Sequence, residues 1–260
     1  MVGKRKEGNV KTNNQFSRYI REKLFTTQDL RRYLESSSVL ITGQDSELVM
    51  DVMVVMPDDL FEGSFRRQFG ECFVVNDHKH RPPVFTRFKS FRWLREDLSR
   101  RLPIALWIFR RASVFQDPNM TFQKIIAECE EVFKKTIHSI ISHKYIEFRS
   151  ERHNLRQVVW HKDKIATDLI RATVVKLAFE IVLLSQGSPY PFKKWLSSEV
   201  DRLDVDGHGL VCLSRKFLME TDLKRVIALS DQLVEYIIDI LSRSDKFSAD
   251  FLQRWWLYLT

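Results

Sequence analysis

The feature that most constrains this fold is a proline-bounded break that follows a long apolar run. The run ends near Leu184, and Ser188-Pro189-Tyr190-Pro191-Phe192 comes shortly after it. Proline lacks an amide hydrogen and disfavours helical geometry in the residue before it, so no helix can continue through this segment. The sequence therefore predicts a helix from about Asp163 to Leu184, an extended stretch after Gly187, and a new helix near Phe192.

Composition places the chain among globular proteins. Hydrophobic residues make up 44% and charged residues 29% of its 260 residues, which argues against wholesale disorder. The longest apolar stretch, Ala178–Leu184, contains Glu180 and is far shorter than the ~20 residues of a membrane span. We therefore expect no membrane segment and no membrane partner.

Three further features suggest the compartment and the partners. Residues 1–14 are basic and polar, so we expect a disordered tail rather than a secretory signal. The three cysteines are widely spaced, which is typical of reduced thiols in a cytoplasmic protein. A net charge of +8 and a pI of about 9.4 favour anionic partners such as a nucleotide or nucleic acid.

Two composition regimes predict two domains, 15–119 and 120–260. The first regime mixes short β-rich runs with helical pieces. Its predicted strands are Val39–Thr42, Leu48–Met56, Cys72–Val75, Ile104–Phe109 and Ala112–Phe115. Its predicted helices are Phe25–Glu35, a short helix after Pro57, and Arg92–Arg101.

The second regime predicts a bundle of five or six helices. Apolar residues recur at helical spacing after Thr121, an expected N-cap. Further helices are expected at Asp163–Leu184, Lys193–Leu203, Asp222–Leu241 and Ala249–Leu259. A charged link at Glu147–Asn154 and a turn at Asp204–His208 are expected to interrupt the helices. The predicted fold class is α+β, a small mixed-sheet domain followed by a helical bundle.

The break also carries a resemblance to a known family. Tyr190-Pro191-Phe192-Lys193-Lys194-Trp195-Leu196 resembles a Tyr-Pro-x-Lys-Lys-Trp-Leu element in the helical part of nucleotidyltransferase-superfamily proteins of the minimal and aminoglycoside-modifying type. Residues 102–118, an apolar run that ends in Asp117-Pro118, are similar to the last strand region of their catalytic domain. The resemblance covers 102–241 closely and 40–101 loosely. It implies a nucleotidyltransferase-like domain and Mg²⁺-dependent transfer from a nucleoside triphosphate.

The motif of active family members is not intact in this chain. Those members carry Gly-Ser on a turn, then Asp-x-Asp, then a third carboxylate on a neighbouring strand; the three acids hold two Mg²⁺ ions. Here Gly63-Ser64 is a candidate phosphate-binding turn, Asp77 is a single candidate metal ligand, and Asp51 is a candidate catalytic and metal-binding acid. Each has a simpler interpretation as a turn, a solvated acid or a capping group. We therefore expect weak or absent transferase activity.

Two groups of cations are candidate phosphate contacts. Lys193 and Lys194 follow the break, and Arg152 and Arg156 lie within the basic segment 149–164. A solvated basic surface is the alternative for both groups. Arg156 and His161 also match the Arg-x4-His signature of HEPN ribonucleases, in which His acts in acid–base catalysis.

The expected function is a diverged nucleotidyltransferase-like protein that binds a nucleotide or polyanion between its domains. The alternatives are a HEPN-like ribonuclease and an antitoxin-type interaction module.

Overall fold

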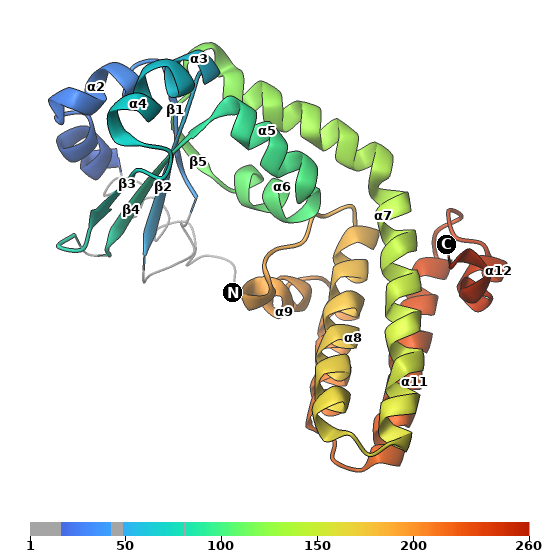
Figure 1. The fold of residues 1–260 in the computed structure, drawn as a ribbon. Helices are drawn as coiled ribbons and strands as arrows, with labels where there is room; N and C mark the ends of the chain where they lie inside the picture. Colours follow the sequence, from blue (N-terminus) through green and yellow to red (C-terminus); the bar gives the residue numbers. More distant parts are fainter. Residues whose placement is uncertain (1–16, 43–48, 81, 260) are drawn as a thin grey trace. The chain divides into compact units, whose positions relative to one another are not determined.

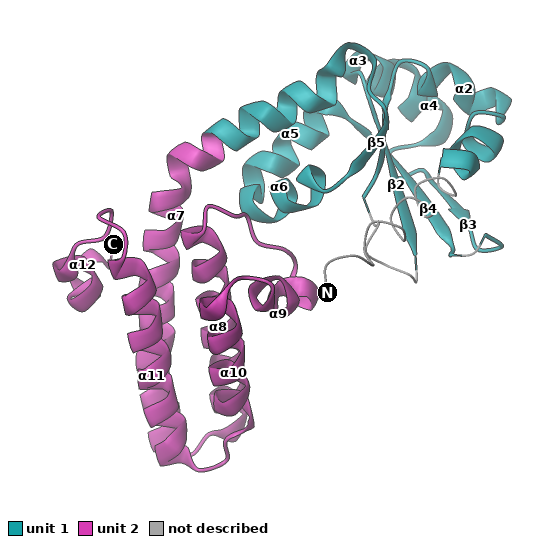
Figure 2. Ribbon diagram, turned by 180° about the vertical axis from the view of Figure 1, so that it is seen from behind, with its two compact units in different colours: residues 1–131 teal, residues 132–260 magenta. Residues whose placement is uncertain are grey.

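The computed structural model describes residues 17–42, 49–80 and 82–259, so the predicted tail 1–14 and Leu48 lie outside the described residues. The chain divides into two compact units, 1–131 and 132–260 (Figure 2). The division falls within one long helix, after the domain boundary that we predict at residue 119.

Unit 1 is built on a five-stranded mixed sheet of order β3-β4-β2-β1-β5 (Figure 1). The central pair β2–β4 is parallel, and every other pair is antiparallel. The strands are β1 Ser38–Ile41, β2 Met50–Met56, β3 Val74–Asp77, β4 Val84–Ser90 and β5 Ser113–Gln116. With the helices below, this sheet confirms the predicted α+β class.

One face of the sheet forms the main core of unit 1. Val52, Val54 and Phe88 point to this face and are fully buried against aromatic rings such as Tyr33 and Phe65. These rings come from the helices η1 Ile20–Leu24, α2 Gln28–Leu34, α3 Asp58–Leu60, η2 Phe61–Phe65 and α4 Arg66–Phe69. Alternation along the strands therefore directs Asp51 and its neighbours Met53 and Val55 to the opposite face.

The strand predicted at Ile104–Phe109 is wrong, because this run lies inside helix α6, Leu102–Arg110. A short apolar run has no periodicity that separates a buried strand from a buried helix. Pro103 in the first turn of α6 is a helix-start signal, since its missing N–H has no partner there in any case. Helix α6 follows α5, Phe91–Arg100, and the edge strand is instead β5, which pairs with β1.

Unit 2 is a helical bundle, and α8 contacts α9, α10 and α11 within it. Its elements are the long α7 Thr121–Trp160, whose first turns belong to unit 1, α8 Lys164–Ser185, α9 Lys193–Asp201, α10 Val205–Met219, α11 Leu223–Ser242, α12 Ala249–Gln253 and η4 Trp255–Tyr258. The carboxylates of Asp163 and Asp222 cap α8 and α11 by accepting hydrogen bonds from backbone amides. Within the described residues, no helix is long and apolar enough to cross a membrane.

The proline break is confirmed. Helix α8 ends at Ser185, and α9 begins at Lys193. Gly187 has a φ of +71°, the left-handed conformation that favours glycine after a helix. The amide of Ser188 donates to the carbonyl of Leu183 at 3.0 Å and closes the end of the helix.

Two predicted interruptions are wrong. Helix α7 continues through Glu147–Asn154, because Phe148 and Leu155 lie on its buried face among the charged residues. The predicted turn Asp204–His208 lies largely in α10, which begins at Val205. Gly207 in that helix packs against the carbonyl of Val200, so closely that a Cβ atom at this position would clash.

Candidate functional site

Asp51 lies at the start of the central strand β2, on the face of the sheet opposite to the main core of unit 1. Its side chain is partly exposed there. It is aligned with Phe85 on β4, and Arg87 lies two residues further along that strand on the same face. Arg87 Nη2 lies 3.4 Å from Asp51 Oδ1, and both side chains are partly exposed. The counter-ion of Asp51 is therefore an arginine on the neighbouring strand, where the family resemblance implies another carboxylate.

Asp77 is on the opposite face of the sheet from Asp51. The register aligns Asp51 with Phe85 and Phe85 with Asn76, so Asn76 shares the face of Asp51 and Asp77 does not. The carboxylate of Asp77 accepts hydrogen bonds from the amides of Lys79 and His80. It also faces the phenol of Tyr19; burial first, and then Asp77, raise the pKa of Tyr19 to about 12.

Gly63 and Ser64 lie in a helix rather than on a turn. Both are within η2, and the Ser64 hydroxyl donates to the carbonyl of Leu60 at 3.2 Å. The amides in the middle of a helix are used by its own hydrogen bonds and are not available to cradle a phosphate. The role predicted for this pair stays a prediction without support from its geometry.

These positions do not fit a two-metal site. Such a site needs carboxylates that converge on one position. Asp51 and Asp77 lie on opposite faces, and Arg87 supplies positive charge beside Asp51. In the part of the chain that the structure describes, no group of three His, Cys, Asp or Glu side chains is arranged to hold a metal ion.

Arg149, Arg152 and Arg156 form a row along one face of α7, at the spacing that places residues on the same side of a helix. We call these three residues the arginine row. Arg152 and Arg156 both pair with the carboxylate of Asp231 on α11, the latter at 3.4 Å. Arg149 donates to the Tyr145 hydroxyl at 2.6 Å and to the carbonyl of Leu252 at 2.9 Å. Two guanidinium groups therefore share the carboxylate of Asp231, and the third, that of Arg149, donates to neutral oxygen atoms.

The surroundings of Arg152 disfavour its positive charge. Its side chain is 15% exposed, and its buried Nε atom has no hydrogen-bond partner in the described residues. Burial, and then the charges of Arg156 and Arg149, lower the pKa of Arg152 to about 10. An added anion beside the arginine row would relieve the repulsion among these guanidinium groups.

The other predicted cations are not part of this row. Lys193 and Lys194 are exposed at the start of α9, and the ammonium of Lys194 lies 3.9 Å from the ring centroid of Trp195. His161 is exposed in the turn beyond the end of α7, and no described hydrogen bond joins it to Arg156. The HEPN-type pairing and the phosphate role of the two lysines remain predictions.

The comparisons with known proteins find similarity to a family model and to solved structures. Residues 103–196 match a family model described as a domain of unknown function (DUF4037). A nucleotidyltransferase-like protein from Exiguobacterium sibiricum 255-15, solved as a crystal structure, is similar at 13% identity and a TM-score of 0.48, over 88% of this chain and 81% of that one. No curated protein matches.

A buried charge cluster in unit 2 was not predicted from the sequence. Glu180 on α8 is almost fully buried between the ammonium groups of Lys144 on α7 and Lys176 on α8. The ring of Tyr190 is buried beside them, and burial, with the charge of Glu180, raises the pKa of Tyr190 to about 12. The only sequence signal was Glu180 itself, an acid within an apolar run.

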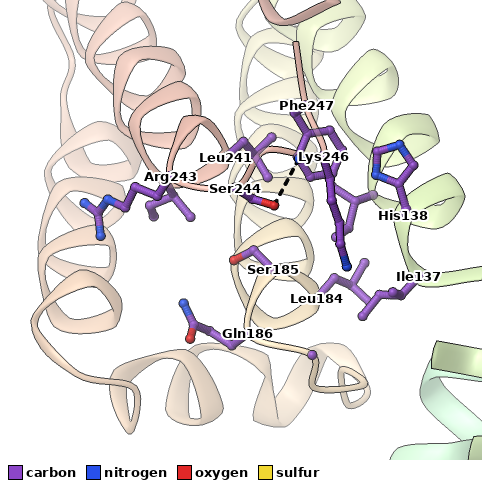
Figure 3. Close-up of a pocket in the computed structure, with 13 residues that line it drawn as sticks. Ile137, His138, Leu184, Ser185, Gln186, Leu241, Arg243, Ser244, Lys246 and Phe247 are labelled. Atoms are coloured by element: carbon purple, nitrogen blue, oxygen red, sulfur yellow. Dashed lines mark hydrogen bonds between the residues drawn. The ribbon is translucent and has the colours of Figure 1, made fainter. Parts of the chain in front are cut away.

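Unit 2 also contains a pocket of about 250 Å³ that the sequence did not predict (Figure 3). Ile137 of α7, Leu184 at the end of α8 and Phe247 after α11 form apolar walls. His138 lies against Phe247, with ring centroids 4.6 Å apart, and Lys246 has no ion-pair partner among the described residues. This lining suits a small molecule with an apolar body and one anionic group.

Proposed function

We propose that this chain is a nucleotidyltransferase-like protein without transferase activity, which binds a nucleotide or longer polyanion through its phosphates at the arginine row of α7. The observation that carries the proposal is the surplus of positive charge: Arg152 and Arg156 share the one carboxylate of Asp231, and Arg149 donates to the neutral oxygen atoms of Tyr145 and Leu252. Phosphate oxygens accept charge-assisted hydrogen bonds from arginine and would supply the missing anion.

The positions of the acids in the sheet support the absence of transferase activity. The chemistry needs at least two acids that converge on a metal ion beside the nucleotide phosphates. Asp51 is paired with Arg87, and Asp77 lies on the other face. We expect no incorporation of labelled nucleotide above background with Mg²⁺. Incorporation that is abolished by Asp51→Asn would contradict this part of the proposal.

The binding part is tested with a labelled single-stranded RNA oligonucleotide in fluorescence anisotropy. Affinity should fall as salt rises, with a logarithmic slope of about −0.7 for each phosphate neutralised. Arg152→Met and Arg156→Gln should each weaken binding and flatten the slope. Adding ATP as a competitor separates a mononucleotide site from one that needs several linked phosphates.

Asp231→Asn provides the sharper test, because the carboxylate of Asp231 competes with a phosphate for the same two arginines. This variant should bind RNA more tightly than the wild type. If the ion pair has only a structural role, the variant should show no gain in RNA affinity. Arg254→Gln is the matched control, since Arg254 is an exposed cation paired with Asp250 outside the row. If RNA does not bind at low salt, or if Arg152→Met binds it normally, the proposal is wrong.

A further inference from the structure

One end of the helical bundle carries an unusual number of exposed apolar side chains. The turn that joins α7 to α8 and the turn that joins α10 to α11 lie side by side at this end (Figures 1 and 2). Arg171 on α8 donates to the carbonyl of Phe217, which ties the start of α8 to the end of α10. We call the exposed apolar residues here the bundle tip: Trp160, Ile165, Leu169, Leu218, Met219 and Leu223.

These side chains project into water rather than back onto the helices. Trp160 is 83% exposed, Ile165 76% and Met219 75%. An open groove of about 570 Å³ lies between Trp160 and Leu223. Single exposed apolar residues are common on proteins, but a group on four adjacent helix ends is typical of an interaction surface.

The charges around the bundle tip are mainly positive. Residues 158–171 and 215–225 contain seven basic and four acidic residues. Backbone amides donate hydrogen bonds to the carboxylates of Asp163, Glu220 and Asp222. The fourth acid, Asp168, forms an ion pair with Arg171. Among the described residues, no ion pair involves the three lysines that surround the apolar group, Lys162, Lys164 and Lys224. The surface therefore combines apolar side chains with unpaired ammonium groups.

We infer that the bundle tip docks on an anionic phospholipid surface, as a peripheral contact, which differs from the sequence-based expectation of no membrane partner. Tryptophan favours the interfacial region of a bilayer, and flanking lysines are attracted to anionic headgroups. A second copy of the same tip would bring like charges together. An amphipathic helix of a partner protein is less suitable, because the exposed residues lie on four helix ends and not along one groove. This inference does not depend on the arginine row.

The test is flotation of the full chain with vesicles of phosphatidylcholine and phosphatidylglycerol in equal parts, and with vesicles of phosphatidylcholine alone. The wild type should float with the anionic vesicles and be released by added salt. The triple variant Trp160→Ser, Ile165→Ser, Met219→Ser should lose about tenfold in membrane partitioning. Its melting temperature should be unchanged, because the three side chains are exposed.

A double variant, Trp256→Ser and Leu257→Ser, removes exposed apolar residues of η4 and should float like the wild type. The inference is wrong if the wild type does not float with anionic vesicles, or if the triple variant floats as well as the wild type.

Gel filtration tests whether a second copy of the chain covers the bundle tip instead. A wild-type dimer that the triple variant converts to a monomer would assign the tip to self-association and would also overturn the inference. RNA binding by the triple variant should be normal, which separates this result from that of the proposed function.

Discussion

Lys144 Nζ on α7 lies 3.1 Å from Glu180 Oε2 on α8. Glu180 is 3% exposed, and its other carboxylate oxygen lies 2.8 Å from Lys176 Nζ. Burial lowers the pKa of Lys144, but Glu180, Tyr190 and Glu147 together outweigh burial, and the net pKa is raised. One buried acid thus holds two partly buried ammonium groups and joins two helices of the bundle.

Replacement of Glu180 by Gln should destabilise unit 2. The two lysines would lose their anion, although both retain some access to water. We expect a loss of about 2–3 kcal/mol in the free energy of unfolding, measured by urea denaturation. The triple variant Glu180→Leu, Lys144→Met, Lys176→Met should recover most of this loss, because no charge is then buried. A Glu180→Gln protein as stable as the wild type would show that the cluster has no energetic role.

Tyr190 should make the fold sensitive to alkali. Its pKa is raised to about 12 in the folded protein, so the unfolded chain, with an ordinary phenol pKa of about 10, ionises first. The contribution of the neutral phenol is complete below pH 10 and is lost as pH rises through the folded pKa. Between pH 10 and 11, the wild type should lose about 1 kcal/mol more stability than Tyr190→Phe. Equal losses in the two proteins would contradict the assigned burial of the hydroxyl.

Leu196 rather than Trp195 should be the core anchor of the element after the break. Both residues follow the break directly, but Trp195 is only half-buried and lies beneath Lys194, whereas Leu196 is 4% exposed. We expect Leu196→Ala to cost about 2–5 kcal/mol, and Trp195→Ala to cost less, in thermal melts. Lys193→Ala should change stability by less than ~0.5 kcal/mol. The reverse order for Leu196 and Trp195 would place the ring in the core after all.

Gly207 should not tolerate a side chain, whereas Gly63 should. A Cβ at Gly207 would meet the carbonyl of Val200, but one at Gly63 would meet no atom within 4 Å. Gly207→Ala should therefore force α9 and α10 apart and lower stability by about 1–3 kcal/mol. Gly63→Ala, within a helix, should be neutral or stabilising by up to ~1 kcal/mol. Circular dichroism melts of the pair provide the comparison, and equal effects would contradict it.

Local signals in the sequence determined the elements that depend on a few neighbouring residues. The prolines at 189 and 191 with Gly187 determined the break, because they exclude helical geometry whatever surrounds them. The caps Asp163 and Asp222 located two helix starts. The apolar strand around Asp51 was also evident, since a run of that composition bounded by proline is typical of a buried strand.

Only the tertiary structure decided what the candidate residues do. Whether Ile104–Phe109 is helix or strand depends on the layer that covers it, because the run is apolar on every side. Strand register placed Asp51 and Asp77 on opposite faces and put Arg87 beside Asp51, and register is set by pairing between distant segments. The surplus charge of the arginine row and the exposed bundle tip likewise arise from helices brought together by packing, which no local pattern in the sequence records.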